Sequence, residues 1–425
     1  GLDGWWLGAG RRVRVQLRRA PLGLALGVGL ATLPSRGQVV EVDMRTQVFH
    51  EPSASSKMTV YTPEVSVSAA PAEGARVFAS YQADAVTGAS EAVKAGPLLS
   101  GVPDIVSRAS VQDYRHVASG GFSLERAHAR LDAAYTYGTE NDYRSNAISV
   151  AAGTDFWQRN TDVELGYSHG FDEVCSLAQR NLPATLRQGL DSSDGCFTAS
   201  ERVEALDISL DNFRVAWTQT WTPVFTTQLI FSGGLQHGFL GNPYRQVVIG
   251  PTGQAAQEHH PDDRSRAAVA LALKYYARSL KTAFGLSARG YRDSWEIQSV
   301  TSELSVERYV FPWLSLLVHG RVYAQSGASF WSDDYTGGEP SYGPRGQYWS
   351  GDREVSPLKT LLAGARLEGT WRADGGGRWV GVFREVSAGV SFDVLKTILD
   401  DFTWAGRAPD DTFVMLPSLA ASGTF

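Results

Sequence analysis

After residue 40 the sequence lacks any run of about twenty apolar residues, the length that an α-helix needs to cross a bilayer. We therefore expect no membrane crossing built from helices in this part of the chain. The sequence also lacks an excess of basic residues, because 39 Lys and Arg stand against 45 Asp and Glu, which gives a formal net charge of −6. A nucleic-acid-binding protein is expected to carry a basic patch, so nucleic acid is not an expected partner.

Cysteine is almost absent, since only Cys175 and Cys196 occur in 425 residues, and both lie in one polar segment. In an exported protein, an isolated pair within one loop most simply forms a disulfide. The alternative interpretation, two ligands of a metal site, lacks further His or Cys residues nearby. We therefore predict a disulfide between Cys175 and Cys196.

Basic and apolar residues are separated near the start of the chain. Arginines at positions 11, 12, 14, 18 and 19 precede an uncharged apolar stretch at 21–33, and small or polar residues follow at 34–38. This order is typical of a secretory signal, and the apolar stretch is too short for a membrane anchor. We therefore assign residues 1–38 to a signal peptide with upstream residues, cleaved near Gly37, and residues 39–425 to the domain that follows. The alternative is an N-terminal helix that plugs that domain.

What the sequence does contain is long alternation of apolar residues with polar or small ones. The clearest example is the segment 266–293, where two alternating stretches flank a short break at 278–281. Such alternation is typical of strands with one face in an apolar medium. Strands of soluble sandwiches are usually about five or six residues long, whereas a tilted strand crossing a bilayer needs about nine to eleven. The length of these stretches favours a transmembrane β-barrel.

The breaks between alternating stretches differ systematically in length. Tight breaks, such as 71–75 and 222–224, alternate with breaks that are mostly longer, such as 172–202 and 327–355. Short turns at one end and long loops at the other are expected of an outer-membrane barrel. Counting from residue 40 to residue 425 predicts an all-β, antiparallel transmembrane barrel of about sixteen strands (about fourteen to eighteen), with short periplasmic turns and long extracellular loops.

Charged residues recur on the small-residue face of several predicted strands, where a dry core would not tolerate them. In a barrel this face lines the lumen, and both signs of charge occur on it. Two interpretations stay open: the charges line an aqueous channel and set its ion preference, or they form cross-strand ion pairs that fill a closed lumen. The predicted lumen-lining residues are Arg130, Asp132, Asp162, Glu164, Arg289, Arg321, Arg366, Glu368 and Asp393.

Tryptophans gather at the predicted short turns, and their indole rings favour the membrane interface. The predicted aromatic girdle consists of Trp157, Trp221, Trp313, Trp371 and Trp379. The chain ends on Phe425, which resembles the terminal signal by which bacterial barrel proteins are recognised for outer-membrane assembly. Barrel-assembly machinery is therefore an expected partner. Pro417 interrupts the hydrogen-bonding pattern of this last predicted strand.

The sequence offers few candidates for chemistry. Residues 166–170 match the G-x-S-x-G pattern of serine hydrolases, but that motif needs a strand, a sharp turn and a helix, and here it lies inside an alternating strand. Weak candidates for metal ligands in two predicted loops are His259, His260, Asp262, Asp333 and Asp334. Their spacing matches no known loop, so polar loop tips are the default interpretation. We expect no catalytic residue, no cofactor and no enzyme activity.

Several local segments together carry a resemblance to a known family: 84–90, 140–145, 155–161, 218–223, 238–245 and 352–357. They resemble a family of bacterial outer-membrane proteins that is catalogued only as a domain of unknown function and regarded as porin-like β-barrels. The resemblance spans residues 40–425 and implies location and fold; it carries no established activity to transfer. Relatives are often encoded beside a small lipoprotein and a flavin-attaching enzyme, which implies an envelope redox context and a periplasmic or lipoprotein partner.

These features together predict an outer-membrane protein of a Gram-negative bacterium, in contact with outer-membrane lipid. The leading hypothesis for its function is a porin-like channel for passive transport of small polar solutes, because a barrel of about sixteen strands leaves an aqueous channel unless loops fold inward. The second is a structural scaffold whose lumen is occupied and which holds envelope partner proteins, redox proteins among them. A membrane-embedded hydrolase is the third, and the sequence offers no convergent Ser/His/acid site for it.

Overall fold

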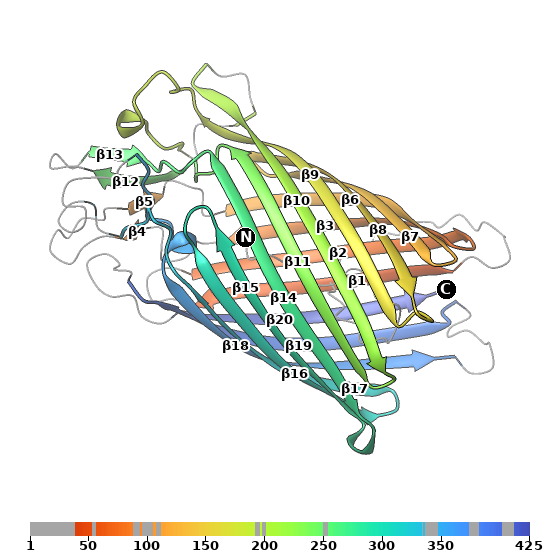
Figure 1. Ribbon diagram of the computed structural model, residues 1–425. Helices are drawn as coiled ribbons and strands as arrows, with labels where there is room; N and C mark the ends of the chain where they lie inside the picture. Colours follow the sequence, from red (N-terminus) through yellow and green to blue (C-terminus); the bar gives the residue numbers. More distant parts are fainter. Residues whose placement is uncertain are drawn as a thin grey trace.

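The computed structural model describes residues 39–52, 57–87, 94–95, 105–107, 112–191, 196–197, 201–249, 254–333, 335, 347–373, 382–401 and 412–425. The predicted signal peptide, residues 1–38, lies outside the described residues, as do Asp334 and Trp379. Long antiparallel strands dominate this part of the chain (Figure 1). Its helices are too short and too polar to span a membrane.

Within the described residues, sixteen strands close into one barrel, which confirms the predicted fold. In order around the barrel they are β1 (Val40–Pro52), β2 (Lys57–Ala72), β3 (Ala75–Thr87), β6 (Gln112–Arg126), β7 (Ala129–Thr139), β8 (Tyr143–Phe156), β9 (Thr161–Leu177), β10 (Val203–Thr222), β11 (Phe225–Gly238), β14 (Asp263–Ala277), β15 (Thr282–Asp293), β16 (Gln298–Phe311), β17 (Leu314–Gln325), β18 (Leu358–Arg372), β19 (Glu385–Leu399) and β20 (Thr412–Thr424).

Closure of the barrel depends on its two terminal strands. β1 pairs antiparallel with β20, from Glu41 opposite Thr424 to His50 opposite Met415. Pro417 lies within β20, opposite Phe392 of β19. Proline has no N–H to donate, so one ladder bond is lost there, while the residues on both sides keep their register. Because both ends are paired, the barrel sheet presents no free edge.

Alternation along each strand determines which face a side chain occupies. On β14 and β15 the outward side chains of Val269 and Leu286 are 45% and 51% exposed, whereas the inward Ala268 and Ala270 are 7% and 6% exposed. Leucine, valine and aromatic side chains continue this exposed apolar surface over the other strands. A contiguous apolar exterior of this extent is what a transmembrane barrel presents to lipid, and it is rare on soluble monomers.

Tight turns join the strands at one end of the barrel. Glu73 and Gly74 connect β2 to β3, and Gly74 adopts a φ of +74°. A Cβ at this position would lie 2.2 Å from the carbonyl oxygen of Glu125, so the turn requires glycine. Another short connection at this end contains the 3-10 helix η3 (Arg278–Leu280), between β14 and β15.

Long connections at the opposite end carry secondary structure of their own (Figure 1, left). The added elements are β4 (Lys94–Ala95), β5 (Ile105–Ser107), η2 (Ala184–Leu186), β12 (Arg245–Ile249), β13 (Gln254–Gln257) and η4 (Arg353–Val355). The four strands pair into a small sheet in the order β13-β12-β5-β4. We call the described residues within 88–111, 178–202, 239–262, 294–297 and 326–357 the loop cap.

The loop cap has its own hydrophobic core, which the sequence analysis did not predict. Three of its connections contribute buried side chains to one cluster. Its members are Val247, Ala256, Trp295, Ile297, Ala328, Phe330, Trp331, Tyr335, Trp349 and Val355. The long loops are therefore packed against one another rather than standing separately in solvent.

The small sheet of the loop cap bridges the mouth of the barrel. β5 belongs to the connection between β3 and β6, and β12 to the connection between β11 and β14. Six barrel strands, β6 to β11, separate these two connections on one side, and the other ten separate them on the other side. β5 and β12 are nevertheless hydrogen-bonded neighbours, with Val247 opposite Ile105. The two connections leave parts of the rim that lie six strands apart, and the small sheet joins them.

Candidate functional site: the barrel lumen and the loop cap

Arg130 is the centre of one cluster of inward charges. Its guanidinium lies 2.7 Å from Glu164 Oε2, and Glu164 also pairs with Arg214 of β10. Asp132 and Asp162 lie 3.3 Å and 3.8 Å from the same guanidinium. Two arginines and three carboxylates thus share one network on the wall formed by β7 to β10.

Gly153 makes this network possible. It lies on β8 directly between Arg130 of β7 and Glu164 of β9 in the strand register. A Cβ at Gly153 would lie 2.7 Å from Nη2 of Arg130. The arginine side chain therefore lies flat across the intervening strand instead of extending into the lumen.

A second cluster repeats this arrangement on β17 to β19. His319 Nε2 lies 3.1 Å from Asp393 Oδ1, and the strand between them carries Gly364. A Cβ at Gly364 would lie 1.6 Å from Asp393 Oδ1 and 2.9 Å from His319 Cε1. Arg366 and Glu368 form an ion pair further along the same strand. Asp393 is one of the predicted lumen-lining residues, whereas His319 is not among them.

The remaining predicted lumen residues also face inward. Arg321 lies opposite Glu303 of β16. The guanidinium of Arg289 lies 5.4 Å from the ring of Tyr291, and Arg289 is opposite Thr301. All nine predicted residues thus lie on the inner wall, where most of them neutralise one another locally.

Four of the five predicted girdle tryptophans are described, and all four lie at the short-turn end. Trp157 and Trp221 are 74% and 57% exposed. Trp313 stacks on Trp371, with ring centroids 5.7 Å apart, and Phe311 also stacks on Trp313 at the same centroid distance. This outward stack is suited to an interface between an apolar and an aqueous layer.

The predicted disulfide between Cys175 and Cys196 is present, with Cα atoms 6.0 Å apart. Cys175 lies at the loop end of β9, where it packs with Leu177 and Leu190. The backbone N–H of Leu190 donates to the carbonyl of Pro243 at 2.7 Å. The disulfide therefore fixes a connection that in turn supports the 239–262 part of the loop cap.

The G-x-S-x-G segment lies within β9, as its alternation predicts. Ser168 faces inward and accepts a hydrogen bond from Asn212 Nδ2 at 3.4 Å. His169 lies on the outward face, 2.9 Å from Asp211 Oδ1. Adjacent residues of a strand point to opposite faces, so this serine and histidine do not face each other.

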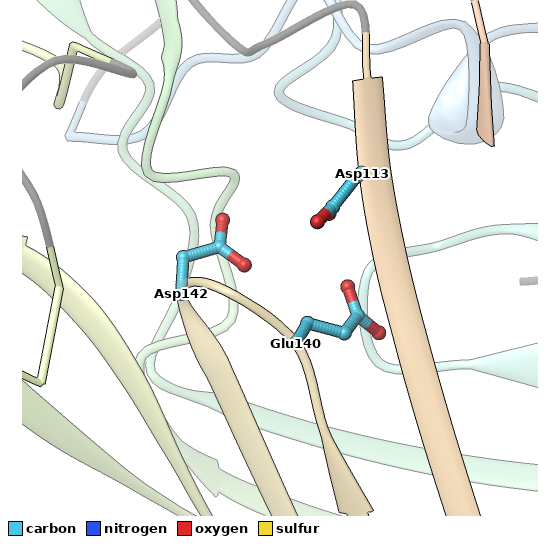
Figure 2. Close-up of side chains that lie close together, drawn as sticks. All are labelled: Asp113, Glu140 and Asp142. Carbon is cyan, nitrogen blue, oxygen red and sulfur yellow. The ribbon is translucent and has the colours of Figure 1, made fainter. Parts of the chain in front are cut away.

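Three carboxylates converge at the long-loop end of β6 and β7 (Figure 2). Asp113, Glu140 and Asp142 each offer an oxygen within 4.8 Å of the others. Arg115 Nε lies 3.3 Å from Glu140 Oε1. Burial raises the pKa of Glu140 to about 7, with the neighbouring acids adding to the effect and Arg115 opposing it. Such a group can accept a hard cation such as Ca²⁺. It was not predicted from the sequence, because β6 supplies Asp113 while the connection between β7 and β8 supplies Glu140 and Asp142.

The predicted loop ligands take different positions. His260 is buried, and its Nε2 lies 3.6 Å from Glu258 Oε2, a residue that the sequence analysis did not single out. His259 Nδ1 instead lies 2.8 Å from the carbonyl of Gln347, and burial lowers the pKa of His259. Asp262 is exposed and Asp333 is half-buried. Within the described part of the chain, the acidic group at Asp113 is the one set of three or more such side chains that converges.

Comparison with known proteins gives one family and a set of similar folds. The model of the family described as Protein of unknown function (DUF3570) matches residues 30–371. No curated protein matches the sequence. The chain is similar to a solved structure titled bacterial polysaccharide outer membrane secretin (10% identity, 91% of this chain and 98% of that chain, TM-score 0.48). It is also similar to the siderophore receptor PirA from Pseudomonas aeruginosa (10%, 89% and 61%, 0.40) and to OccK2 (OpdF) from Pseudomonas aeruginosa (9%, 91% and 97%, 0.39).

Proposed function

The chain belongs to the family described as Protein of unknown function (DUF3570), and from this premise we propose that it is an outer-membrane channel of a Gram-negative bacterium. In this proposal the barrel is porin-like, passes small polar solutes passively, and is narrowed at its outer mouth by the loop cap. The observation that carries the proposal is the closed sixteen-stranded barrel with an apolar exterior and a charged inner wall. No enzymatic step is part of it.

The dimensions and surface of the barrel support a position in the membrane. A tilted strand crosses the hydrocarbon layer in about nine to eleven residues, and the shortest barrel strand, β7, has 11. The stacked rings of Phe311, Trp313 and Trp371 lie at the short-turn end, where the proposal places the periplasmic interface. The exterior between the two ends offers lipid an apolar surface.

The charged side chains of the inner wall favour the passage of small polar solutes of either charge. Each cluster contains arginine paired with carboxylate, so a passing ion meets both signs at close range. A wall of this kind lowers the free energy of dehydrating a polar solute, and it does not create a strong electrostatic potential of one sign. We therefore infer weak ion selectivity, with size limited by the loop cap.

Single-channel conductance in a planar bilayer tests the proposal. The refolded protein is measured at several salt concentrations, after circular dichroism has shown a strand-rich fold. Ohmic steps that scale with salt are the expected result. The unaltered protein is compared with a variant in which large side chains in the hydrophobic core of the loop cap are truncated. If both proteins are folded and neither conducts, the barrel is not a channel.

The bridge across the mouth favours a second candidate, a scaffold. In this proposal the lumen stays closed, and the barrel holds a periplasmic or lipoprotein partner, with redox proteins as the class to test first. Val247 opposite Ile105 joins distant parts of the rim, which is the observation behind it. Affinity purification from outer membranes, followed by mass spectrometry and a haem and flavin absorbance scan, would separate the two. A stoichiometric partner together with zero conductance favours the scaffold.

A further inference from the structure

A carboxylate and an imidazole face each other inside the loop cap without a partner between them. The side chains of Glu258 and His260 are 0% and 4% exposed, and Oε2 of the first lies 3.6 Å from Nε2 of the second. Neither atom has a hydrogen-bond partner among the described residues. Both residues line a cavity of about 180 Å³ together with Phe239, Leu240 and Gly241.

The tautomer of His260 follows from its other nitrogen. Nδ1 lies 3.0 Å from the carbonyl oxygen of Leu240, which can only accept, so Nδ1 carries a proton and donates it. In the neutral ring Nε2 then has a free lone pair aimed at a carboxylate oxygen. Two buried acceptors in this position repel each other unless a cation lies between them. Metal-binding histidines typically have this arrangement, with the second nitrogen bonded to a backbone carbonyl.

Both side chains are held in place by neighbouring parts of the loop cap. Glu258 Oε1 accepts hydrogen bonds from Ser350 Oγ at 3.2 Å and from the N–H of Gly351 at 2.9 Å. The ring of His260 lies between Trp295 and Phe330, with centroid distances of 5.2 Å and 5.3 Å. The free atoms Oε2 and Nε2 are therefore fixed in position before any ligand arrives.

The other buried charges nearby already have partners. Arg245 also interacts electrostatically with Glu258, but its direct ion pair is with a different carboxylate, because Nη1 lies 2.6 Å from Asp352 Oδ1. Arg187, which also lines the cavity, donates instead to the carbonyls of Leu182 and Arg180. Asp262 also lines the cavity but is exposed, so the free oxygen of Glu258 is the buried carboxylate oxygen that faces it.

We propose that Glu258 and His260 bind one divalent transition-metal ion, of the class of Zn²⁺ or Co²⁺, through Oε2 and Nε2. An ion about 2.1 Å from each atom subtends an angle of about 120° across the 3.6 Å gap, which tetrahedral coordination accommodates. A mixed imidazole and carboxylate pair suits these ions. Water in the cavity completes the coordination, since each water takes about 30 Å³ of liquid volume.

The ion would join two connections of the loop cap. Glu258 and His260 belong to the segment between β11 and β14, while Ser350 and Gly351, which fix the carboxylate, belong to the segment between β17 and β18. Bound metal therefore stabilises the packing of these two connections in the loop cap. The site does not depend on whether the barrel conducts.

Two measurements on the full barrel in detergent test the site. They are isothermal titration calorimetry with ZnCl₂ and visible absorption spectroscopy with CoCl₂. The expected result is one saturable site per chain, which excess Ca²⁺ does not displace. Glu258→Gln, which keeps an acceptor for Ser350 and Gly351, and His260→Gln should each weaken binding about tenfold or more. His237→Asn is the matched control, because His237 is 73% exposed beside Asp263, and it should bind as the unaltered protein does.

Two results would overturn the proposal. One is the absence of saturable Zn²⁺ binding to the folded unaltered protein, which would leave a proton as the cation between the two groups. The other is unchanged affinity in both Glu258→Gln and His260→Gln, which would place the metal elsewhere; Glu140→Gln then tests the acidic group. If the variants fail to fold, the X-ray absorption spectrum of the Zn²⁺-loaded unaltered protein decides, because a spectrum without imidazole scattering refutes the site.

Discussion

Replacement of Arg130 by glutamine separates the two interpretations of the charged wall. The cluster contains Arg130 and Arg214 against three carboxylates, so the substitution changes its formal charge from −1 to −2. A unit charge about 7 Å from a passing monovalent ion in water contributes about 0.6 kcal/mol, with opposite sign for cation and anion. Cation preference over anions should therefore rise by up to about eightfold at low salt, and by less as salt screens the charge.

The assay is the reversal potential in a potassium chloride gradient, measured on single channels. Glu164→Gln is the matched variant on the other side of the same ion pair, and it should shift the reversal potential in the opposite direction. The double variant should return close to the original value. Reversal potentials that stay unchanged in all three conducting variants would refute the reasoning, because these side chains would then not face the permeation path.

Four further predictions follow from the same structure. Trp349→Ala removes a side chain that is 2% exposed and donates to the Gln257 carbonyl; it should destabilise the loop cap by about 3–5 kcal/mol and enlarge the conductance steps. Replacing both Cys175 and Cys196 by serine should cost about 2–4 kcal/mol in the 178–202 connection and speed its proteolysis, while the barrel strands stay protected from hydrogen exchange. Because the pKa of Glu140 is raised, its protonation stabilises the folded state below about pH 4.5, and this stabilisation is lost as the pH rises through about 7. Addition of Ca²⁺, or the substitution Glu140→Gln, should therefore flatten a plot of unfolding free energy against pH between about 4.5 and 7. Phe425→Ala removes a ring that lies 4.8 Å from the ring of Phe383, and it should cost about 1 kcal/mol of barrel stability, as unfolding by guanidinium in detergent would show.

The barrel was predictable because its signal is local. The segment 266–293 forms β14 and β15, and the short break inside it is η3. Each strand of the barrel pairs with neighbours in sequence order, so alternation and break lengths contain most of the topology. The inward charges follow from the same period of two, which places Arg130 and Asp393 correctly without any knowledge of their partners.

The loop cap was not predictable for the opposite reason. β5 and β12 pair across more than a hundred residues of sequence, and the paired stretches are too short to show alternation. Trp295, Phe330 and Trp349 come from three positions in polar segments, so nothing local indicates a shared core. The metal candidates show the same limit: the sequence analysis identified His260 and missed Glu258, whose fixed orientation depends on Ser350, 92 residues away.

The attachments of the loop cap decide how the mouth can open. β5 joins β12 from one side of the rim, and the N–H of Leu190 joins the cap to the disulfide-linked connection. On another side, Arg353 Nη1 lies 3.3 Å from Glu51 Oε1, at the end of β1, and Glu51 is 1% exposed.

A cap attached at several points of the rim and packed around a common core has no single hinge about which it could swing. Opening the mouth therefore requires either loss of the shared core or release of one connection while the others stay in place. In the proposed channel, solutes that pass without such a change use the part of the opening that lies beside the pairing of β5 with β12.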